Sequence, residues 1–113
     1  MIKLFNLCWA QINMEAFNEE QIKAVIQNLN GWEYADGALT KRYMFRNFRD
    51  CMAFMQRVAF EIEELNHHPE WFNVYHKLNV RLCTHDVNGI TKKDHQLAKK
   101  FDEHFAHFAA QPS

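Results

Sequence analysis

The chain contains few of the residues that interrupt regular structure, with three glycines and two prolines among 113 residues. Average usage would make these two residue types about 12% of a chain, so we expect long elements joined by short loops. No run approaches the roughly 20 apolar residues that span a bilayer. Residues 1–13 also lack the cleavage site of a secretory signal. We therefore expect a cytoplasmic protein that does not associate with membranes.

An excess of either charge is missing too, because 13 Lys and Arg stand against 14 Asp and Glu. Proteins that bind DNA or RNA directly usually carry a basic stripe, and the two lysine doublets, 92–93 and 99–100, fit the solvated face of a helix instead. We expect no direct nucleic-acid contact. The cysteines are odd in number and lack C-x-x-C spacing, which predicts reduced thiols rather than a disulfide framework: Cys8, Cys51 and Cys83.

The length suits one domain, and no internal repeat divides it. We expect a folded domain over residues 17–113 and an N-terminal extension over residues 1–16. The extension is mildly apolar, and three interpretations stay open for it: a strand, a disordered segment, or sequence upstream of an alternative start at Met14. Its role is not predicted.

Capping and turn residues delimit the first elements. Asn18-x-x-Gln21 is a capping box, and the helix that it opens should stop at Asn30-Gly31. Asp36-Gly37 favours a type I′ turn between strands at 32–35 and 38–45. Asn47 is the predicted cap of a second helix, which should run to about residue 66.

The second half repeats this pattern. Apolar and polar residues alternate from Trp71 to His85, which predicts a hairpin turning near residues 75–77. Thr91-x-x-Asp94 opens the last helix. In the hairpin, one face should carry a set of apolar residues: Phe72, Val74, Leu78, Val80 and Leu82. The order α-β-β-α-β-β-α predicts an α+β domain, a four-stranded antiparallel sheet with its helices packed on one face.

The predicted helix over residues 48–65 has an unusually wide apolar face. It covers close to half of the helical wheel, against the ~100° of an ordinary surface helix. Packing on the sheet would hide part of this face, and a second subunit is the simplest cover for the rest. We therefore expect a homodimer or homotetramer.

Two polar clusters, at residues 63–71 and 83–86, stand at the two ends of the predicted hairpin. The hairpin would bring His67 and His68 beside Thr84 and His85, with Trp71 close by. Imidazoles titrate near pH 6.5 and can act as acid or base, so this arrangement suits proton transfer.

Other interpretations of these residues stay open. The His67-His68 pair could be an exposed helix end favoured by the helix dipole. Cys83, His85 and one member of the pair could bind zinc, although the usual ligand doublet and a fourth ligand are missing. Cys83 could be a nucleophile if its pKa were lowered, but a small buried thiol is the simpler interpretation.

Several short segments together resemble one enzyme family. They are residues 66–75 (NHHPEWFNVY), residues 82–86 (LCTHD), Gly31-Trp32 and the Phe-rich helix that contains Arg57-Val58-Ala59. HHPEW followed at this distance by Thr-His resembles the signature of the pterin-4a-carbinolamine dehydratases, also called 4a-hydroxytetrahydrobiopterin dehydratases. The resemblance extends from about Phe17 to Phe108.

The resemblance implies a carbon–oxygen lyase that dehydrates 4a-hydroxytetrahydropterin to quinonoid dihydropterin and so recycles tetrahydrobiopterin. It implies acid–base catalysis without a cofactor or a metal. The matching catalytic positions are His67, His68 and His85, with Asp94 as a supporting carboxylate that could equally be a first-turn helix acid. The matching substrate-binding positions are Glu63, Pro69, Trp71, Thr84, Asp86 and Val87. Glu63 could equally be a solvated helix residue.

At two positions the chain departs from the pattern. Asn66 stands where the family often has Asp, and Cys83 stands where Ser is common. The resemblance also implies a second class of function, because animal members serve as dimerisation cofactors of a homeodomain transcription factor. A helical protein partner, and with it a nuclear location, is therefore the alternative to the enzyme.

Overall fold

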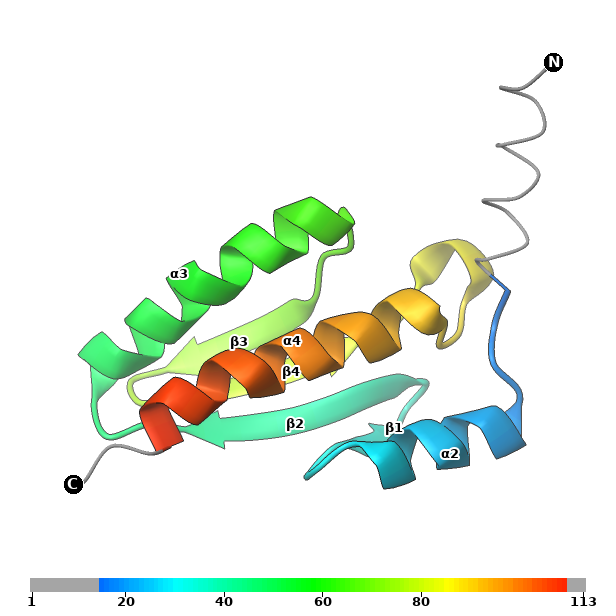
Figure 1. The fold of residues 1–113 in the computed structure, drawn as a ribbon, viewed down its shortest axis with the longest axis horizontal. Helices are drawn as coiled ribbons and strands as arrows, with labels where there is room; N and C mark the ends of the chain where they lie inside the picture. Colours follow the sequence, from blue (N-terminus) through cyan, green and yellow to red (C-terminus); the bar gives the residue numbers. More distant parts are fainter. Residues whose placement is uncertain (1–14, 110–113) are drawn as a thin grey trace, which may run out of the picture.

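The computed structural model describes residues 15–109. The element order is α-β-β-α-β-β-α, as predicted, with a short 3₁₀ helix, η1, before the last α-helix (Figure 1). The elements are α2 (Glu19–Asn28), β1 (Glu33–Ala35), β2 (Ala38–Met44), α3 (Phe48–Leu65), β3 (Glu70–Val74), β4 (Lys77–Leu82), η1 (His85–Val87) and α4 (Lys92–Ala109). Most of the predicted extension, residues 1–16, lies outside the described residues.

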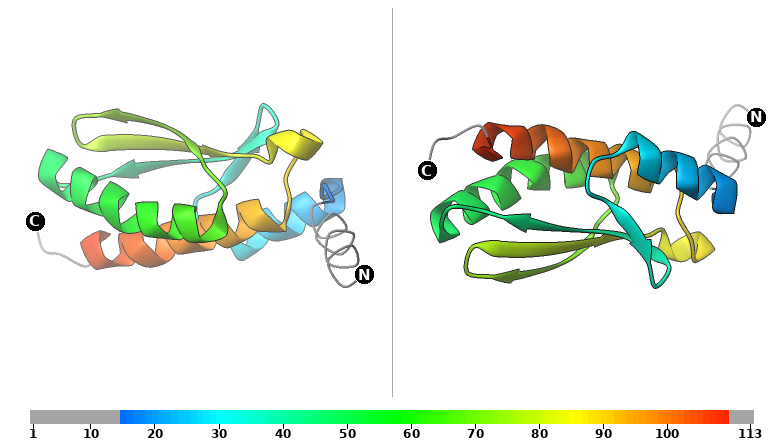
Figure 2. Two further views of the ribbon diagram at one scale, coloured as in Figure 1. Left: turned by 90° about the horizontal axis from the view of Figure 1, so that it is seen from above. Right: turned by 90° about the horizontal axis from the view of Figure 1, so that it is seen from below.

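The strands form a four-stranded antiparallel sheet in the order β1-β2-β4-β3. The two central strands pair Leu39 with Leu82 and Tyr43 with Leu78, and all four side chains are buried. The helices lie together on one face of the sheet (Figure 2), which confirms the predicted α+β class. Among residues 15–109, no helix is long and apolar enough to cross a membrane.

Local sequence signals explain where the elements begin and turn. The side chains and backbones of Asn18 and Gln21 bond reciprocally at the start of α2, and the Asn47 side chain accepts the Asp50 amide at the start of α3. Asp36 and Gly37 have φ angles of 52° and 77°, the positive values that a type I′ turn requires. The predicted capping box at Asn18, the predicted cap at Asn47 and the hairpin turn are therefore present.

Aromatic rings fill most of the space between α3, α4 and the sheet. Tyr43 lies 5.1 Å from Phe54 and 4.8 Å from Phe105, measured between ring centroids. The predicted stripe of α4 faces this core, with Leu97 and Phe101 fully buried and Phe105 and Phe108 partly buried.

One carboxylate of α4 ties the helix to the first hairpin. Asp102 accepts hydrogen bonds from Trp32 Nε1 at 3.0 Å, Lys41 Nζ at 2.8 Å and Tyr43 Oη at 2.5 Å. Burial, together with this carboxylate, raises the pKa of Tyr43 far above its usual range. The Asp102 cluster is thus a polar contact that orients α4 over the sheet.

The prediction that Phe72 and Val74 lie on the buried face of the hairpin is wrong. Phe72 and Val74 are 65% and 53% exposed, whereas Trp71 and Asn73 are partly buried. The reason is the two-residue turn, which pairs Val74 with Lys77 and therefore places Asn73 opposite Leu78. Tyr75 adopts φ 54° in this turn, and the Asn73 amide caps it through the carbonyls of Tyr75 and Lys77. A side chain thus supports the turn at a position without glycine.

Candidate active site

The N-terminus of α4 carries a fully buried carboxylate. Asp94 Oδ2 accepts the Thr91 amide at 2.8 Å and the Thr84 hydroxyl at 2.7 Å, while Oδ1 lies 2.6 Å from His67 Nε2. The Asp94 side chain is 0% exposed and that of His67 is 10% exposed. The sequence left two interpretations for Asp94, and the structure shows both contacts: the carboxylate caps the helix and binds an imidazole.

The end of α3 separates the two adjacent histidines. Asn66 is the C-cap of α3 in the left-handed conformation, with φ 50°. Asparagine tolerates this conformation better than most residues, which gives the unusual Asn66 a structural role. After it, His67 is buried against Asp94, whereas His68 is 59% exposed and lies 3.1 Å from Glu63 Oε1 through Nε2.

The third histidine has a partner on the neighbouring strand. His85 Nε2 lies 3.5 Å from Glu70 Oε2 and 3.9 Å from Cys83 Sγ. Burial is the main cause that raises the pKa of the Cys83 thiol, and the carboxylates of Glu70 and Asp94 raise it further. A thiol held in its protonated form is a poor nucleophile, so this environment does not favour covalent catalysis by Cys83.

Four of the predicted residues surround a shallow hollow beside the end of α3. The hollow has a volume of about 220 Å³ and lies between α3 and the start of β3. Its lining consists of Ala59, Ile62, Glu63, His68, Pro69 and Trp71. An indole and a proline ring offer apolar surface, and the Glu63–His68 pair offers polar groups at the rim. This combination suits a small planar polar ring.

The other predicted binding residues, Thr84, Asp86 and Val87, do not line this hollow. Thr84 is buried and its hydroxyl bonds Asp94, while its amide bonds the Gly89 carbonyl at 2.8 Å. Asp86 is exposed and Val87 is partly buried, both within η1. Their contacts with a substrate stay predictions.

The hairpin brings the two polar clusters together as the sequence predicted. Glu70 pairs with Arg81 in the β3–β4 register, so the residues just before β3 lie beside those just after β4. Asp94, which lies outside both clusters, bonds His67 of one and Thr84 of the other and so links them. Each imidazole nevertheless has a different carboxylate partner: Asp94 for His67, Glu63 for His68 and Glu70 for His85.

Sequence reasoning gave no site role to two of the residues involved. Glu70 was only part of a motif, and its contact with His85 depends on cross-strand pairing. Thr91 was only a helix cap, yet its hydroxyl lies 2.8 Å from that of Thr84. The register of the hairpin is the signal that could have identified Glu70.

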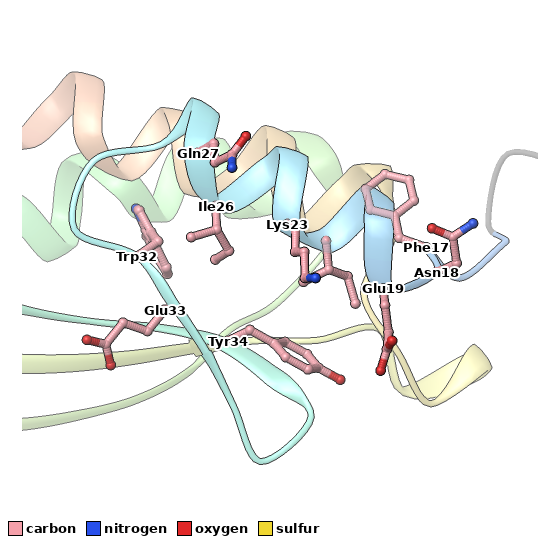
Figure 3. A pocket seen from close by; sticks show the side chains of 10 residues that line it. Phe17, Asn18, Glu19, Lys23, Ile26, Gln27, Trp32, Glu33 and Tyr34 are labelled. Atoms are coloured by element: carbon pink, nitrogen blue, oxygen red, sulfur yellow. The ribbon is translucent and has the colours of Figure 1, made fainter.

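A larger hollow lies elsewhere, between α2 and β1 (Figure 3). It has a volume of about 980 Å³, and its lining includes the apolar side chains of Phe17, Ile26, Trp32 and Tyr34. It contains none of the predicted catalytic or binding residues. Size alone therefore does not identify the candidate site, since the smaller hollow is the one lined by His68 and three other predicted residues.

Comparison with known proteins identifies the family. Residues 15–104 match the family model described as pterin 4 alpha carbinolamine dehydratase. A protein of Opitutus terrae named "Putative pterin-4-alpha-carbinolamine dehydratase" is 50% identical over 86 residues, which cover 75% of this chain and 89% of the relative. A Sinorhizobium fredii protein of the same name is 46% identical over 91 residues, or 79% of this chain and 87% of that protein.

A solved structure has the same fold. The crystal structure of a transcriptional coactivator/pterin dehydratase from Brucella melitensis superposes with a TM-score of 0.78 at 35% identity. The match covers 80% of this chain and 98% of the Brucella chain. Family model, relatives and fold agree, and the chain belongs to the pterin-4-alpha-carbinolamine dehydratase family.

Proposed function

We propose that this protein dehydrates 4a-hydroxytetrahydropterin to quinonoid dihydropterin, in the recycling of tetrahydrobiopterin, by histidine acid–base catalysis. Membership of the dehydratase family supports the reaction class. The observation that carries the proposal is the buried His67–Asp94 pair, held at 2.6 Å. Asp94 also bonds Thr84, the neighbour of His85 in the chain.

The reaction needs two proton transfers and nothing more. The C4a–O bond breaks as the oxygen accepts a proton and leaves as water, and a base removes the proton of a ring N–H. Groups that titrate near neutral pH can supply both transfers. The proposed catalytic residues are His67, His68 and His85.

Asp94 determines how the His67 ring is oriented. As a carboxylate, it accepts from Thr84 and from the Thr91 amide on one oxygen, so its other oxygen accepts Nε2–H of His67. This bond fixes the neutral tautomer and leaves Nδ1 as an acceptor. Asp94 therefore positions His67.

His68 and His85 are more open, with 59% and 71% of their side chains exposed. Exposed imidazoles exchange protons with water readily, which suits groups that must be reset after each turnover. In the proposal, Trp71 and Pro69 contact the flat face of the pterin and Glu63 orients His68. Thr84, Asp86 and Val87 are proposed to contact the pterin partly through backbone groups.

The test is a dehydration assay with synthetic 4a-hydroxytetrahydropterin. The wild-type protein should accelerate dehydration above the rate in buffer, and His68→Ala should lower that acceleration by ~10². His107→Ala removes an exposed histidine from the last turn of α4 and should leave the rate unchanged. A wild-type protein without acceleration would reject the proposal.

A second candidate function is the binding of a helical protein partner, as a coactivator would require. The Brucella relative carries a coactivator name, and α3 exposes Phe48, Met52 and Phe60. Flexible Met side chains and exposed aromatic rings suit a helix partner. Co-purification of such a partner, lost in Phe60→Glu, would support this function; a homo-oligomer that catalyses dehydration and captures no partner would favour the enzyme alone.

A further inference from the structure

Three different metal-ligating side chains meet on the outer side of the sheet, at the end of the β3–β4 hairpin. They are Glu70, Cys83 and His85, and their donor atoms all lie within 4.8 Å of one another. The Cys83 Sγ–His85 Nε2 distance is 3.9 Å and the His85 Nε2–Glu70 Oε2 distance is 3.5 Å.

The backbone explains why these donors meet. Thr84 is buried and bonded to Asp94, so its neighbours in the chain, Cys83 and His85, are directed to the other side. The register places Glu70 opposite Arg81, two residues before Cys83. Arg81 Nε donates to Glu70 Oε1 at 3.1 Å, which leaves Oε2 facing His85. The carboxylate is therefore already held by an outer hydrogen bond, as ligating carboxylates usually are.

The donor set and its spacing fit a zinc-class ion. Zinc takes thiolate, imidazole and carboxylate ligands at about 2.3, 2.0 and 2.0 Å in a tetrahedron. These bond lengths give S–N and N–O edges of roughly 3.5 and 3.3 Å, so the two distances to His85 must contract by a few tenths of an ångström. The Cys83 and Glu70 donors, which lie within 4.8 Å of each other, must close to roughly 3.5 Å. We propose that Glu70, Cys83 and His85 form a binding site for a zinc-class divalent cation, with water in the fourth position.

Binding exchanges a proton for the ion, because the Cys83 thiol must release its proton to form the metal–sulfur bond. The carboxylates of Glu70 and Asp94 supply negative charge near Cys83, and Arg81, paired with Glu70 at 3.1 Å, supplies an opposing positive charge. The ion would be an inhibitor and not a cofactor, because it occupies the ring nitrogen of His85. This consequence rests on the proposed function, in which His85 must be free to transfer a proton.

Cobalt(II) is the probe for the site, because it adopts zinc-like tetrahedral geometry and a cobalt–thiolate bond gives a charge-transfer absorption. Titration should be done in a Cys8→Ser background, which removes the one cysteine outside the described residues; Cys51 is buried in the core. We expect a saturable charge-transfer band of one cobalt per chain, displaced by zinc.

Matched variants decide whether the band comes from this cluster. Cys83→Ser should abolish it, and Glu70→Gln should weaken affinity at least ~10-fold, since loss of even an outer-shell partner costs about 10–100-fold. Glu64→Gln changes an exposed glutamate of α3 outside the cluster and should change neither the absorption band nor the cobalt affinity. A parent protein without a saturable band, or a Cys83→Ser protein that keeps it, would overturn the site.

Inhibition is measured separately. Zinc should slow dehydration by the wild-type protein, EDTA should restore the rate, and Cys83→Ser should be at least ~10-fold less sensitive. Equal sensitivity of the two proteins would refute inhibition through this site. The cobalt spectrum requires no turnover, so failure of the dehydratase proposal and failure of the metal site give different results.

Discussion

Replacing Asp94 by Asn separates the catalytic role of this carboxylate from its structural role. The two side chains have nearly the same shape, but an amide has one oxygen where the carboxylate accepts from three donors. If the amide oxygen keeps the Thr84 and Thr91 bonds, its NH₂ group faces His67 Nε2. His67 must then present Nε2 as an acceptor, which moves the ring proton to Nδ1 and inverts the tautomer.

The cost can be estimated for each role. Hydrogen bonds to charged groups contribute about 1.5–3 kcal/mol each, and an acid in the first turn of a helix contributes roughly 0.3–1 kcal/mol. With the geometry kept, we expect a loss of about 2 kcal/mol in the free energy of unfolding, or ~8–16 °C in Tm. The wrong tautomer should lower kcat by about 10²–10⁴.

Asp102→Asn is the matched control, because it makes the same substitution further along α4. Asp102 also accepts three hydrogen bonds, in its case all from side chains, those of Trp32, Lys41 and Tyr43, but it contacts no histidine of the site. Both variants should lose stability, and only Asp94→Asn should lose kcat when measured well below the Tm of each protein. Wild-type kcat in a destabilised Asp94→Asn protein would show that Asp94 is only a helix cap and refute the reasoning.

Three further results are expected. Dialysis against EDTA should leave the dehydration rate undiminished, whereas loss of activity restored by stoichiometric zinc would contradict a reaction that needs no metal. Light scattering should give a multiple of the 13.5 kDa chain mass, because Phe60, Phe72 and Val74 leave apolar surface exposed; a monomer at micromolar concentration would refute this. Burial, with a smaller effect of Lys99, lowers the pKa of His95, so its contribution to stability is full above pH ~6.5 and is lost as the pH falls below that value. The Tm of His95→Gln should therefore fall less than that of the wild type on acidification. Equal falls in the two proteins would contradict this contribution of His95.

Helix caps and the first hairpin could be predicted because their signals are local. Asn18, Asn47 and Thr91 each act within three residues of their own position. The face of β3 could not be predicted, since its phase depends on whether the turn holds two residues or three. Tyr75 in a left-handed conformation is an uncommon choice, and no glycine marked the position.

In the candidate site, too, some features could be predicted from the sequence and others could not. The resemblance could name the motif residues and the hairpin could place the two clusters together. The resemblance could not show that His67 would be buried and His68 exposed, because this depends on how the chain leaves α3 after the left-handed Asn66. The pairing of His85 with Glu70 depends on strand register, which periodicity alone does not determine.

The most direct test of the central claim is the dehydration rate of His67→Ala, His68→Ala and His85→Ala, singly and in pairs. Each single variant that removes a proton-transfer group should lose ~10² or more in kcat, and one that only positions the pterin should mainly raise KM. If the three act as one unit, the double variants should lose less than the product of the single losses. Full activity in all three single variants would contradict catalysis by these histidines.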